Sequence, residues 1–351
     1  MLLVCCAHAG RVSPQSFFLA PFAALGFMPL LLIVLVALVV AMLWRRWWAV
    51  LEIVAAVVFT ASIISQFVPI NSPDEGPPVP ADTTMILDVM TYNVLGFNYI
   101  DPEINAESST TMRLILDANP DVVLMQESLP GGLEWTEIPS LVPLVNEIKA
   151  KYPYCYFGNE GLSLMSKYPF TTQPLTESIE SRSPLGYNRN NTAYLARAYD
   201  LQMPNGKQLR LVNFRLQSYH LSFGKNQSVR VSPEAKPSRI ERMRRSFALR
   251  EKNATTLRQA IDNSPATVIV CGDMNDITTS HVYRTIKGDD LKDAWRDAGT
   301  GYAYTYNKFG LLYRIDHIFY RGSIKALNAK RLKGGSSDHY PLVATFDIDI
   351  K

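Results

Sequence analysis

The sequence predicts a mixed α/β domain, with two sheets packed between helices, that follows a pair of membrane-spanning helices. From residue 83 onward, strand-like apolar runs alternate with helix-like runs, and several of the strand-like runs end in acids or amides. Residues 17–43, by contrast, hold no charged residue at all. The composition, 47% hydrophobic and 19% charged, is that of a folded chain and excludes a disordered one.

Two apolar segments near the N-terminus are long enough to cross a bilayer. Residues 17–43 are uncharged, and residues 47–70 are interrupted only by Glu52. A spanning helix needs roughly 20 apolar residues, so we expect a membrane anchor in residues 1–70, with helices over about 17–43 and 47–70. Two buried helices of a soluble protein are the alternative, but the first run is longer than a typical core helix.

Between these segments, Arg45 and Arg46 lie among tryptophans. Arginines favour the cytoplasmic side and tryptophans the interface, so we expect everything after Ile70 to lie outside the cytoplasm. Residues 1–16 are either part of a third span or a short signal-like segment without the usual basic start. Residues 71–82 hold four prolines. They predict an extended, semi-rigid linker that holds the domain, residues 83–351, off the bilayer.

Charge is unevenly distributed along the chain. The net charge is +3, yet residues 225–258 hold ten Lys and Arg against three Glu. This basic segment is either a surface for phosphate-bearing partners or a solvated helix face. The low overall charge argues against tight, non-specific binding of duplex nucleic acid. The four cysteines have no CxxC or Cys/His spacing, which excludes a zinc-finger type of site.

The elements of the domain follow from apolar periodicity and from turn residues. Helices are predicted after candidate N-caps at 108–111, over 141–153, over the basic stretch 238–262 and from Ser280. Strands are predicted over 86–94, 121–128, 154–158, 162–166, 266–276, 314–320 and 340–349, with a hairpin formed by 192–201 and 208–218.

Polar residues gather at the ends of these strands. They are Asn93, Glu127, Asp273 with Asn275, Asp316, and Asp338 with His339. An unpaired buried carboxylate costs several kcal/mol, so the fold alone gives no reason to place acids there. Strand ends on one rim are where such folds assemble sites.

The chemistry of these residues predicts metal-assisted hydrolysis of a phosphate ester. Glu127 is the best ligand for Mg²⁺ or Mn²⁺, and Asn93 can add a neutral oxygen. Of Asp273 and Asn275, one would accept a proton from the attacking water and the other would hold that water or the phosphate. His339 could face an anionic transition state as a cation, with Asp316 raising its pKa.

Each of these signals also has a purely structural explanation. A DxN sequence after a strand is often a turn that caps itself, and SDH before a strand is commonly an N-terminal turn.

In order along the chain, TYNVLGF, LMQES, CGDMND, YRIDHIF and SDHYPLVA resemble the motifs of the endonuclease/exonuclease/phosphatase superfamily. The resemblance covers about residues 86–350, and the two helices ahead of it are similar to the membrane-anchored bacterial branch. It implies a four-layer α/β sandwich and an Mg²⁺- or Mn²⁺-dependent phosphoesterase. Together with the orientation expected from Arg45 and Arg46, it predicts a position in the bacterial inner membrane with the domain on the periplasmic side.

The resemblance also implies roles for the residues at the strand ends. Glu127 would be the principal metal ligand with Asn93 beside it, and Asp338 would be a further metal ligand or orient the metal site. Asp273 would position or deprotonate water, and Asn275 would contact the scissile phosphate. Asp316 would pair with His339, which would stabilise developing charge.

One residue departs from the family pattern. Many members carry a histidine where this chain has Arg215. Arginine does not exchange protons near neutral pH, but it can clamp a phosphate oxygen or a leaving group. His220 is a possible substitute, although five residues along a strand would place it on the opposite face.

The leading hypothesis is therefore a membrane-anchored, metal-dependent phosphodiesterase whose partners are the bilayer and a phosphodiester, either a phospholipid or a nucleic acid. No protein partner is predicted. Because of Arg215, the alternative is a degenerate enzyme that serves as a tethered binding module for phosphate-bearing ligands. A purely structural membrane protein would leave the acids at the strand ends unexplained.

Overall fold

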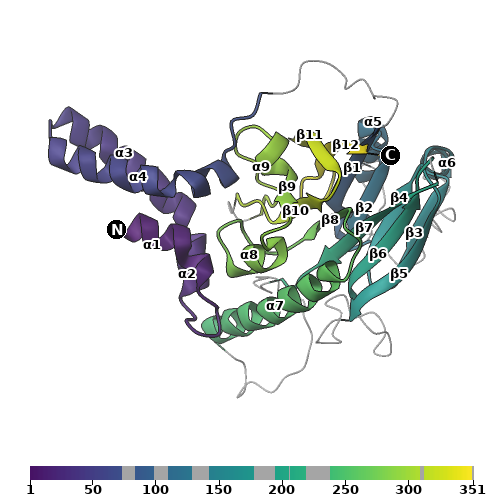
Figure 1. The fold of residues 1–351 in the computed structure, drawn as a ribbon, viewed down its shortest axis with the longest axis horizontal. Coiled ribbons are helices and arrows are strands. Elements are labelled where there is room, and N and C mark those ends of the chain that lie inside the picture. The colour runs from purple at the N-terminus through teal and green to yellow at the C-terminus, as the bar shows by residue number, and fades with distance from the viewer. Residues whose placement is uncertain are drawn as a thin grey trace.

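A computed structural model of the chain describes residues 1–72, 84–98, 110–128, 142–177, 194–204, 206–218, 238–308 and 312–349. In this part of the chain two six-stranded mixed sheets pack face to face, and helices cover their outer faces (Figure 1). The predicted four-layer α/β sandwich is confirmed.

Each sheet combines parallel and antiparallel neighbours. The strands of the first sheet, in chain order, are β1 (Thr84–Asn93), β2 (Val122–Gln126), β3 (Tyr154–Phe157), β4 (Ser163–Ser166), β11 (Ile324–Arg331) and β12 (Leu342–Asp349). Those of the second are β5 (Phe170–Glu177), β6 (Tyr194–Gln202), β7 (Gln208–Arg215), β8 (Val268–Asp273), β9 (Lys292–Asp293) and β10 (Asp316–Arg321). Across the sheets the orders are β11-β12-β1-β2-β4-β3 and β5-β6-β7-β8-β10-β9.

The site-bearing strands are central in their sheets and buried on both faces. Every residue of β2 and of β8 is buried, which is why both read as continuous apolar runs. β1 runs parallel to β2, and β7 runs parallel to β8. Parallel neighbours end at the same edge of a sheet, so the polar residues that follow these strands are brought together there.

The helices of the domain are α5 (Thr110–Ala118), α6 (Val142–Lys151), α7 (Arg239–Asp262), α8 (His281–Lys287), α9 (Ala294–Ala298) and the 3-10 helix η2 (Leu95–Asn98). α9 packs into the core between the two sheets, whereas α5 to α8 lie on their outer faces. Met112 and Ile115 of α5 pack with Val123 of β2 on the first sheet. Leu257 of α7 packs with Val270 of β8 on the second.

The basic stretch forms the predicted long helix, and its first residues explain its start. The hydroxyl of Ser238 accepts a hydrogen bond from the backbone N–H of Glu241 at 3.1 Å. This is a Ser-x-x-Glu capping arrangement.

The N-terminal region forms an arm, residues 27–67, and a collar at the base of the arm, residues 2–25 (Figure 1). Its helices are α1 (Leu2–His8), the 3-10 helix η1 (Ala9–Arg11), α2 (Ala20–Leu25), α3 (Phe27–Leu43) and α4 (Trp47–Phe67). The chain breaks at Gly26, and Pro29 fits the first turn of the next helix, so residues 17–43 are not one helix. α1 spans seven residues, or about 10 Å.

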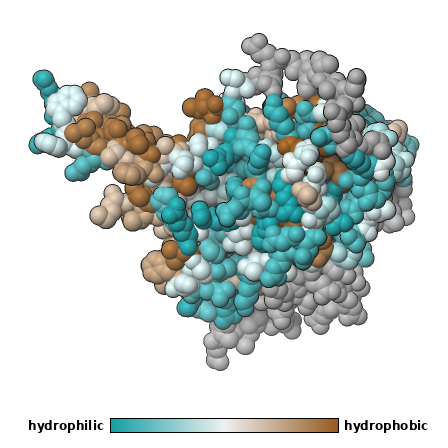
Figure 2. Space-filling model, viewed as in Figure 1, coloured by the Kyte–Doolittle hydropathy of each residue, from teal (hydrophilic) through white to brown (hydrophobic). Residues whose placement is uncertain are grey.

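α4 is the only helix in the described residues that is long and apolar enough to cross a membrane. Its large apolar side chains are exposed, as at Val58 (67%) and Phe59 (74%), so it is not a buried core helix. α3, which lies beside it, is apolar but shorter. Figure 2 shows the resulting hydrophobic surface of the arm.

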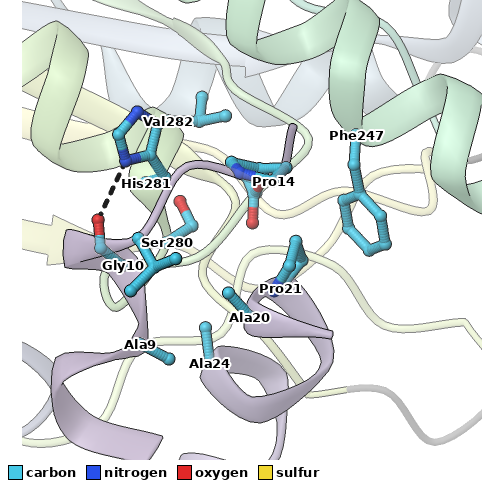
Figure 3. Close-up of a pocket in the computed structure, with 12 residues that line it drawn as sticks. Ala9, Gly10, Pro14, Ala20, Pro21, Ala24, Phe247, Ser280, His281 and Val282 are labelled. Carbon is cyan, nitrogen blue, oxygen red and sulfur yellow. Dashed lines mark hydrogen bonds between the residues drawn. The ribbon is translucent and has the colours of Figure 1, made fainter. Parts of the chain in front are cut away.

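The collar packs against the turn that follows β8 in the second sheet (Figure 3). The hydroxyl of Thr279 donates to Ala24 O at 3.1 Å, and Nδ1 of His281 lies 3.1 Å from Gly10 O. A Cβ on Gly10 would lie 2.2 Å from Thr279 O, so only glycine permits this approach. A small pocket lies between the N-terminal segment and the domain, and Phe247 and Asp276 are among the domain residues that line it.

The end of α4 is also fixed to the domain. Asn71 donates through Nδ2 to Gly299 O at 2.7 Å, and Nη2 of Arg314 donates to Gln66 O at 3.2 Å. The predicted linker is described only as far as Ser72, and the rest of it lies outside the described residues. Asn71 contacts α9, so the end of α4 meets the domain before the proline-rich segment begins. That residues 71–82 hold the domain off a bilayer stays a prediction.

Candidate active site

Strand register brings the predicted residues to one rim. In the second sheet Arg215 of β7 lies opposite Asp273 of β8, and Asp273 lies opposite Asp316 of β10. Three charged residues therefore form a row across three neighbouring strands. In the first sheet, Asn93 ends β1 and Glu127 follows β2.

Asn93 joins the two sheets at the site. Its fully buried side chain donates through Nδ2 to Glu127 Oε1 and to Asp273 Oδ2, each at 3.0 Å. Its oxygen accepts from the backbone N–H of Leu95 at 3.1 Å. In this orientation Asn93 bridges the two carboxylates through its nitrogen, and its role as a metal ligand stays a prediction.

Glu127 has an unusual backbone and a cationic partner. Its φ of 53° lies in the left-handed region, which is costly for a non-glycine residue and is typical of functional sites. Arg215 Nη2 lies 2.5 Å from its Oε1, and Arg215 Nε lies 4.0 Å from Asp273 Oδ2. Burial raises the pKa of Glu127, but the charge of Arg215 and the hydrogen bond from Asn93 outweigh it and bring the pKa below its usual value.

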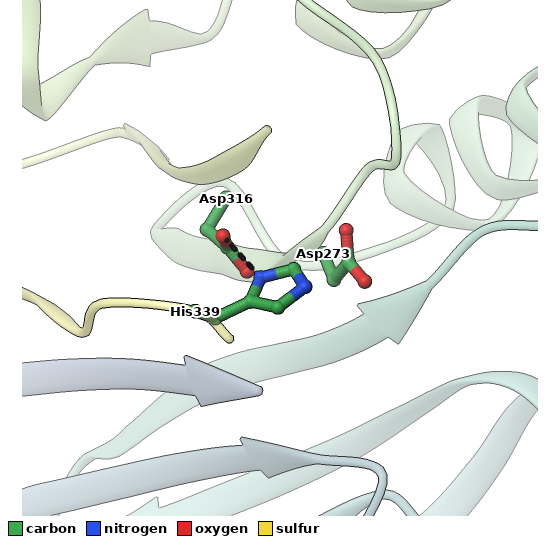
Figure 4. Close-up of side chains that lie close together, drawn as sticks. All are labelled: Asp273, Asp316 and His339. Atoms are coloured by element: carbon green, nitrogen blue, oxygen red, sulfur yellow. Dashed lines mark hydrogen bonds and ion pairs between the residues drawn. The ribbon is translucent and has the colours of Figure 1, made fainter. Parts of the chain in front are cut away.

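Asp316 and His339 form the predicted pair (Figure 4). His339 Nδ1 donates to Asp316 Oδ2 at 2.8 Å, and both side chains are buried. Burial on its own lowers the pKa of His339. The charge of Asp316 and the hydrogen bond to it, together with the charges of Asp273 and Asp338, outweigh burial and raise the pKa to about 10. The imidazole is therefore a buried cation at neutral pH.

Asp273 lies on the other side of this imidazole (Figure 4) and is 1% exposed. Burial raises its pKa to about 6, with Asp316 and Glu127 adding to the rise while His339 and Arg215 oppose it. A carboxylate with a pKa near neutrality is suited to accept a proton. One ligand atom each from Asp273, Asp316 and His339 all lie within 4.8 Å of one another.

The DxN sequence forms a turn that caps itself, as its structural explanation expects. The backbone N–H of Asn275 donates to Asp273 Oδ1 at 2.8 Å, and Nδ2 donates to Asp273 Oδ2 at 3.0 Å and to Leu216 O at 2.9 Å. Asn275 has a φ of 51°. Arg250 of α7, fully buried, donates to Asn275 O and lies 3.6 Å from Asp276, so the basic helix supports this turn from below.

Asp338 is held at the edge of the site. Its Oδ2 lies 2.7 Å from Lys308 Nζ, while its Oδ1 is buried and has no hydrogen-bond donor among the described residues. The buried Oδ1 of Asp316 also lacks a donor there.

Several functional residues were not predicted. Tyr306 packs its ring against His339, with 5.3 Å between ring centres. Burial, with smaller effects from the negative charges of Asp338, Asp273 and Glu127, raises the pKa of Tyr306 to about 12. The phenol is therefore neutral at physiological pH. Its place in the loop before β10 carries no strand or motif signal.

Two hydroxyls hold the backbone of the site. Thr305 Oγ1 accepts from the N–H of Asp316 at 3.1 Å, and Ser337 Oγ donates to Asn93 O at 2.6 Å. Ser337 directly precedes the predicted residues Asp338 and His339, and this position in the sequence could have indicated a role at the site. His220 falls in 219–237, outside the described residues.

The acids fit a hard divalent cation. Glu127, Asp273, Asp316 and Asp338 supply carboxylate oxygens, the ligands that Mg²⁺ and Mn²⁺ prefer. The two buried oxygens without donors, one on Asp316 and one on Asp338, are the kind of atom that a bound cation satisfies.

Residues 90–339 match the Endonuclease/Exonuclease/phosphatase family. The chain belongs to this family. Its enzymes are hydrolases that act on phosphoester bonds, typically with a divalent metal, and the matched segment runs from β1 to His339, so it takes in all eight predicted site residues. A search of curated proteins finds no match.

Solved structures of the endonuclease/exonuclease/phosphatase family are similar to the chain at 18% identity. One is from Beutenbergia cavernae, with a TM-score of 0.49 over 75% of this chain and 72% of that one. Another is sphingomyelinase C from Streptomyces griseocarneus, with a TM-score of 0.49 over 74% and 99%. A third is TDP2 from D. rerio with a single-strand DNA product, with a TM-score of 0.49 over 74% and 98%.

Proposed function

We propose that the protein is a membrane-anchored, divalent-metal-dependent phosphodiesterase. The observation that supports this most is the position of Asp273, a buried carboxylate with a pKa of about 6, beside the buried His339–Asp316 pair. A base and a fixed cation on one rim are what in-line attack of water on a phosphate needs.

Glu127 and Asp338 would hold Mg²⁺ or Mn²⁺, with Asn93 keeping Glu127 in place. When bound, the metal would polarise the phosphate and stabilise the charge that develops on its oxygens.

The other residues act on water and phosphate. Asp273 takes the proton of the attacking water. His339, kept charged by Asp316, donates a hydrogen bond to a phosphate oxygen and stabilises the charge that builds on it. Arg215 turns its fork of donors from Glu127 to the phosphate. Asn275 contacts the scissile phosphate through its amide, which in the free protein bonds to Leu216 O.

The substrate class we favour is a phosphodiester in or near the bilayer, such as a phospholipid headgroup, with a nucleic acid as the second candidate. The arm and the moderate net charge of +3 support the first. We place the domain on the periplasmic side of the inner membrane, because Arg45 and Arg46 lie in the turn at the far end of the arm.

The test uses the full chain in detergent micelles, because the collar and the end of α4 pack onto the domain. Hydrolysis of a generic diester and a generic monoester is measured with Mg²⁺, Mn²⁺ or chelator. We expect metal-dependent diester cleavage that falls by about 10²–10⁴-fold in Asp273→Asn. Asp117→Asn, the same change at an exposed position on α5, should retain full activity.

Absence of turnover with either metal, in a chain with a cooperative unfolding transition, would contradict the proposal. It would favour the tethered binding module instead.

A further inference from the structure

The chain before α3 presents an unusual outer face. Its inner face packs on the turn after β8, but Phe17, Phe18 and Leu19 are 52%, 39% and 46% exposed, and Val12 is 40% exposed. Three consecutive exposed apolar side chains are rare on a soluble surface unless another phase or a partner covers them.

Arginines of α7 lie beside this apolar run. Arg242, Arg244 and Arg245 are all exposed, and Glu241, the one acid in that first turn, forms an exposed ion pair with Arg245 at 3.2 Å. The Arg244 guanidinium lies 5.8 Å from the centre of the Phe18 ring. Residues 12–19 and these three arginines therefore form one continuous surface, called the headgroup face below.

The position of the headgroup face relative to the arm identifies what covers it. α4 has 21 residues, or about 31 Å, close to the roughly 30 Å of a hydrocarbon core. Trp44, Trp47 and Trp48 are exposed at the tip of the arm, where one interface is expected. The second interface then falls at the base, where α1 and α2 run across the arm and the first turns of α7 reach the same level (Figure 1).

We propose that the headgroup face docks on the anionic phospholipids of the bilayer that the arm crosses. This inference rests on the proposed membrane anchoring but not on the proposed hydrolysis. The side chains of Phe17, Phe18 and Leu19 enter the interface, and the three guanidiniums pair with lipid phosphates through their forked donors.

Charge and apolarity together favour a bilayer over a nucleic acid. Arginines alone would suit either polyanion, but a nucleic acid gains little from three neighbouring apolar side chains that lie at the level of a membrane interface. Each basic residue near an anionic membrane strengthens association by about five-fold, so three of them make docking depend strongly on lipid charge.

Arginine reactivity tests this in the intact protein. The full chain is placed in nanodiscs of phosphatidylcholine, with or without phosphatidylglycerol, and phenylglyoxal modification is followed by mass spectrometry at low extent. We expect a several-fold slower reaction at Arg242, Arg244 and Arg245 in the anionic discs, which high salt reverses. Arg113, 52% exposed on α5 at the opposite side of the domain, serves as the internal reference.

Equal rates in the two kinds of disc, or equal slowing at Arg113, would overturn the proposal. So would protection of the same arginines in neutral discs by an added oligonucleotide to the level seen with phosphatidylglycerol. A double variant, Phe17→Ser with Phe18→Ser, should lose most of the protection of the arginines. Full protection in this variant would show that the apolar run plays no part in docking. Failure of the chain to enter discs would instead contradict the anchoring.

Discussion

His339 combines full burial with a positive charge, and this makes its titration a direct test of the site. Asp316 and the neighbouring acids overcome the effect of burial and raise its pKa to about 10. His317 is buried too, but burial and Arg314 lower its pKa to about 3. In a metal-free NMR titration we expect one imidazole to stay charged until about pH 10, and to titrate lower in Asp316→Asn.

The same shift has a consequence for stability. The folded pKa is raised above the unfolded value of about 6.5, so the stabilisation from this pair is fully present below that value and is lost as pH rises toward 10. Urea unfolding at a series of pH values should show a decline over that range. The Asp316→Asn variant should be less stable and lack most of this decline, and an identical pH dependence would contradict the pairing.

Arg215 lies where it competes with a cation for Glu127. Removing its charge in Arg215→Gln should therefore strengthen Mn²⁺ binding several-fold, measured by electron paramagnetic resonance of the free ion, while diester turnover falls because a phosphate contact is lost. Arg210→Gln, which breaks a pair with Asp200 on the same hairpin, is the control. Unchanged Mn²⁺ affinity in Arg215→Gln would show that the ion pair is not in competition.

Much of the site could be predicted because its residues belong to strand ends. Asp316 and His339 were expected to pair, and they do. The ion pair between Arg215 and Glu127 links the two sheets. It could not be predicted, because no local sequence pattern indicates how one sheet is aligned on the other. Tyr306 and Lys308 come from a loop whose path is set only by packing.

At the scale of elements, the turn after β8 is supported from two sides, by α7 and by the collar. Gly10 tests the second support. A Cβ there would lie 2.2 Å from Thr279 O, and overpacking of this kind costs about 1–3 kcal/mol. We expect Gly10→Ala to lower turnover several-fold and to speed hydrogen exchange of the amides of residues 276–282.

The control is Gly26→Ala in the same N-terminal segment. A Cβ on Gly26 would lie 3.4 Å from the nearest atom, and its φ of −73° suits any residue. This variant should match the unchanged protein in turnover and exchange. Equal effects of the two substitutions, or slow exchange of residues 276–282 in both, would mean that the collar does not support the turn.

Most helices and strands were predicted, and the exceptions have physical reasons. Residues 170–177 contain Pro174, and residues 324–331 expose Lys325, Asn328 and Lys330, so neither was recognised as a strand. Both lie at the edge of a sheet, where proline and lysine are tolerated. The break at Gly26 was hidden because hydrophobicity is the same on both sides of it.

For the whole molecule, orientation in the membrane is the untested prediction. If the proposed orientation holds and Arg45 and Arg46 lie on the cytoplasmic side, a reporter that is active only outside the cytoplasm should be active when fused after Lys351, and a cytoplasmic reporter should be silent. Replacing both arginines by glutamine should weaken this preference. If only the cytoplasmic reporter were active, the orientation would be the opposite of the one proposed.

The contacts of Gln66 and Asn71 with the domain have a kinetic consequence. A domain on a loose tether explores a volume set by the length of its linker, but in the proposed membrane-anchored state this domain would explore only the plane of the bilayer. A substrate in the same bilayer would then arrive by lateral diffusion, and the rate would follow its surface density rather than its bulk concentration. Diluting the substrate with inert lipid should slow the reaction, whereas diluting the vesicles with buffer should not.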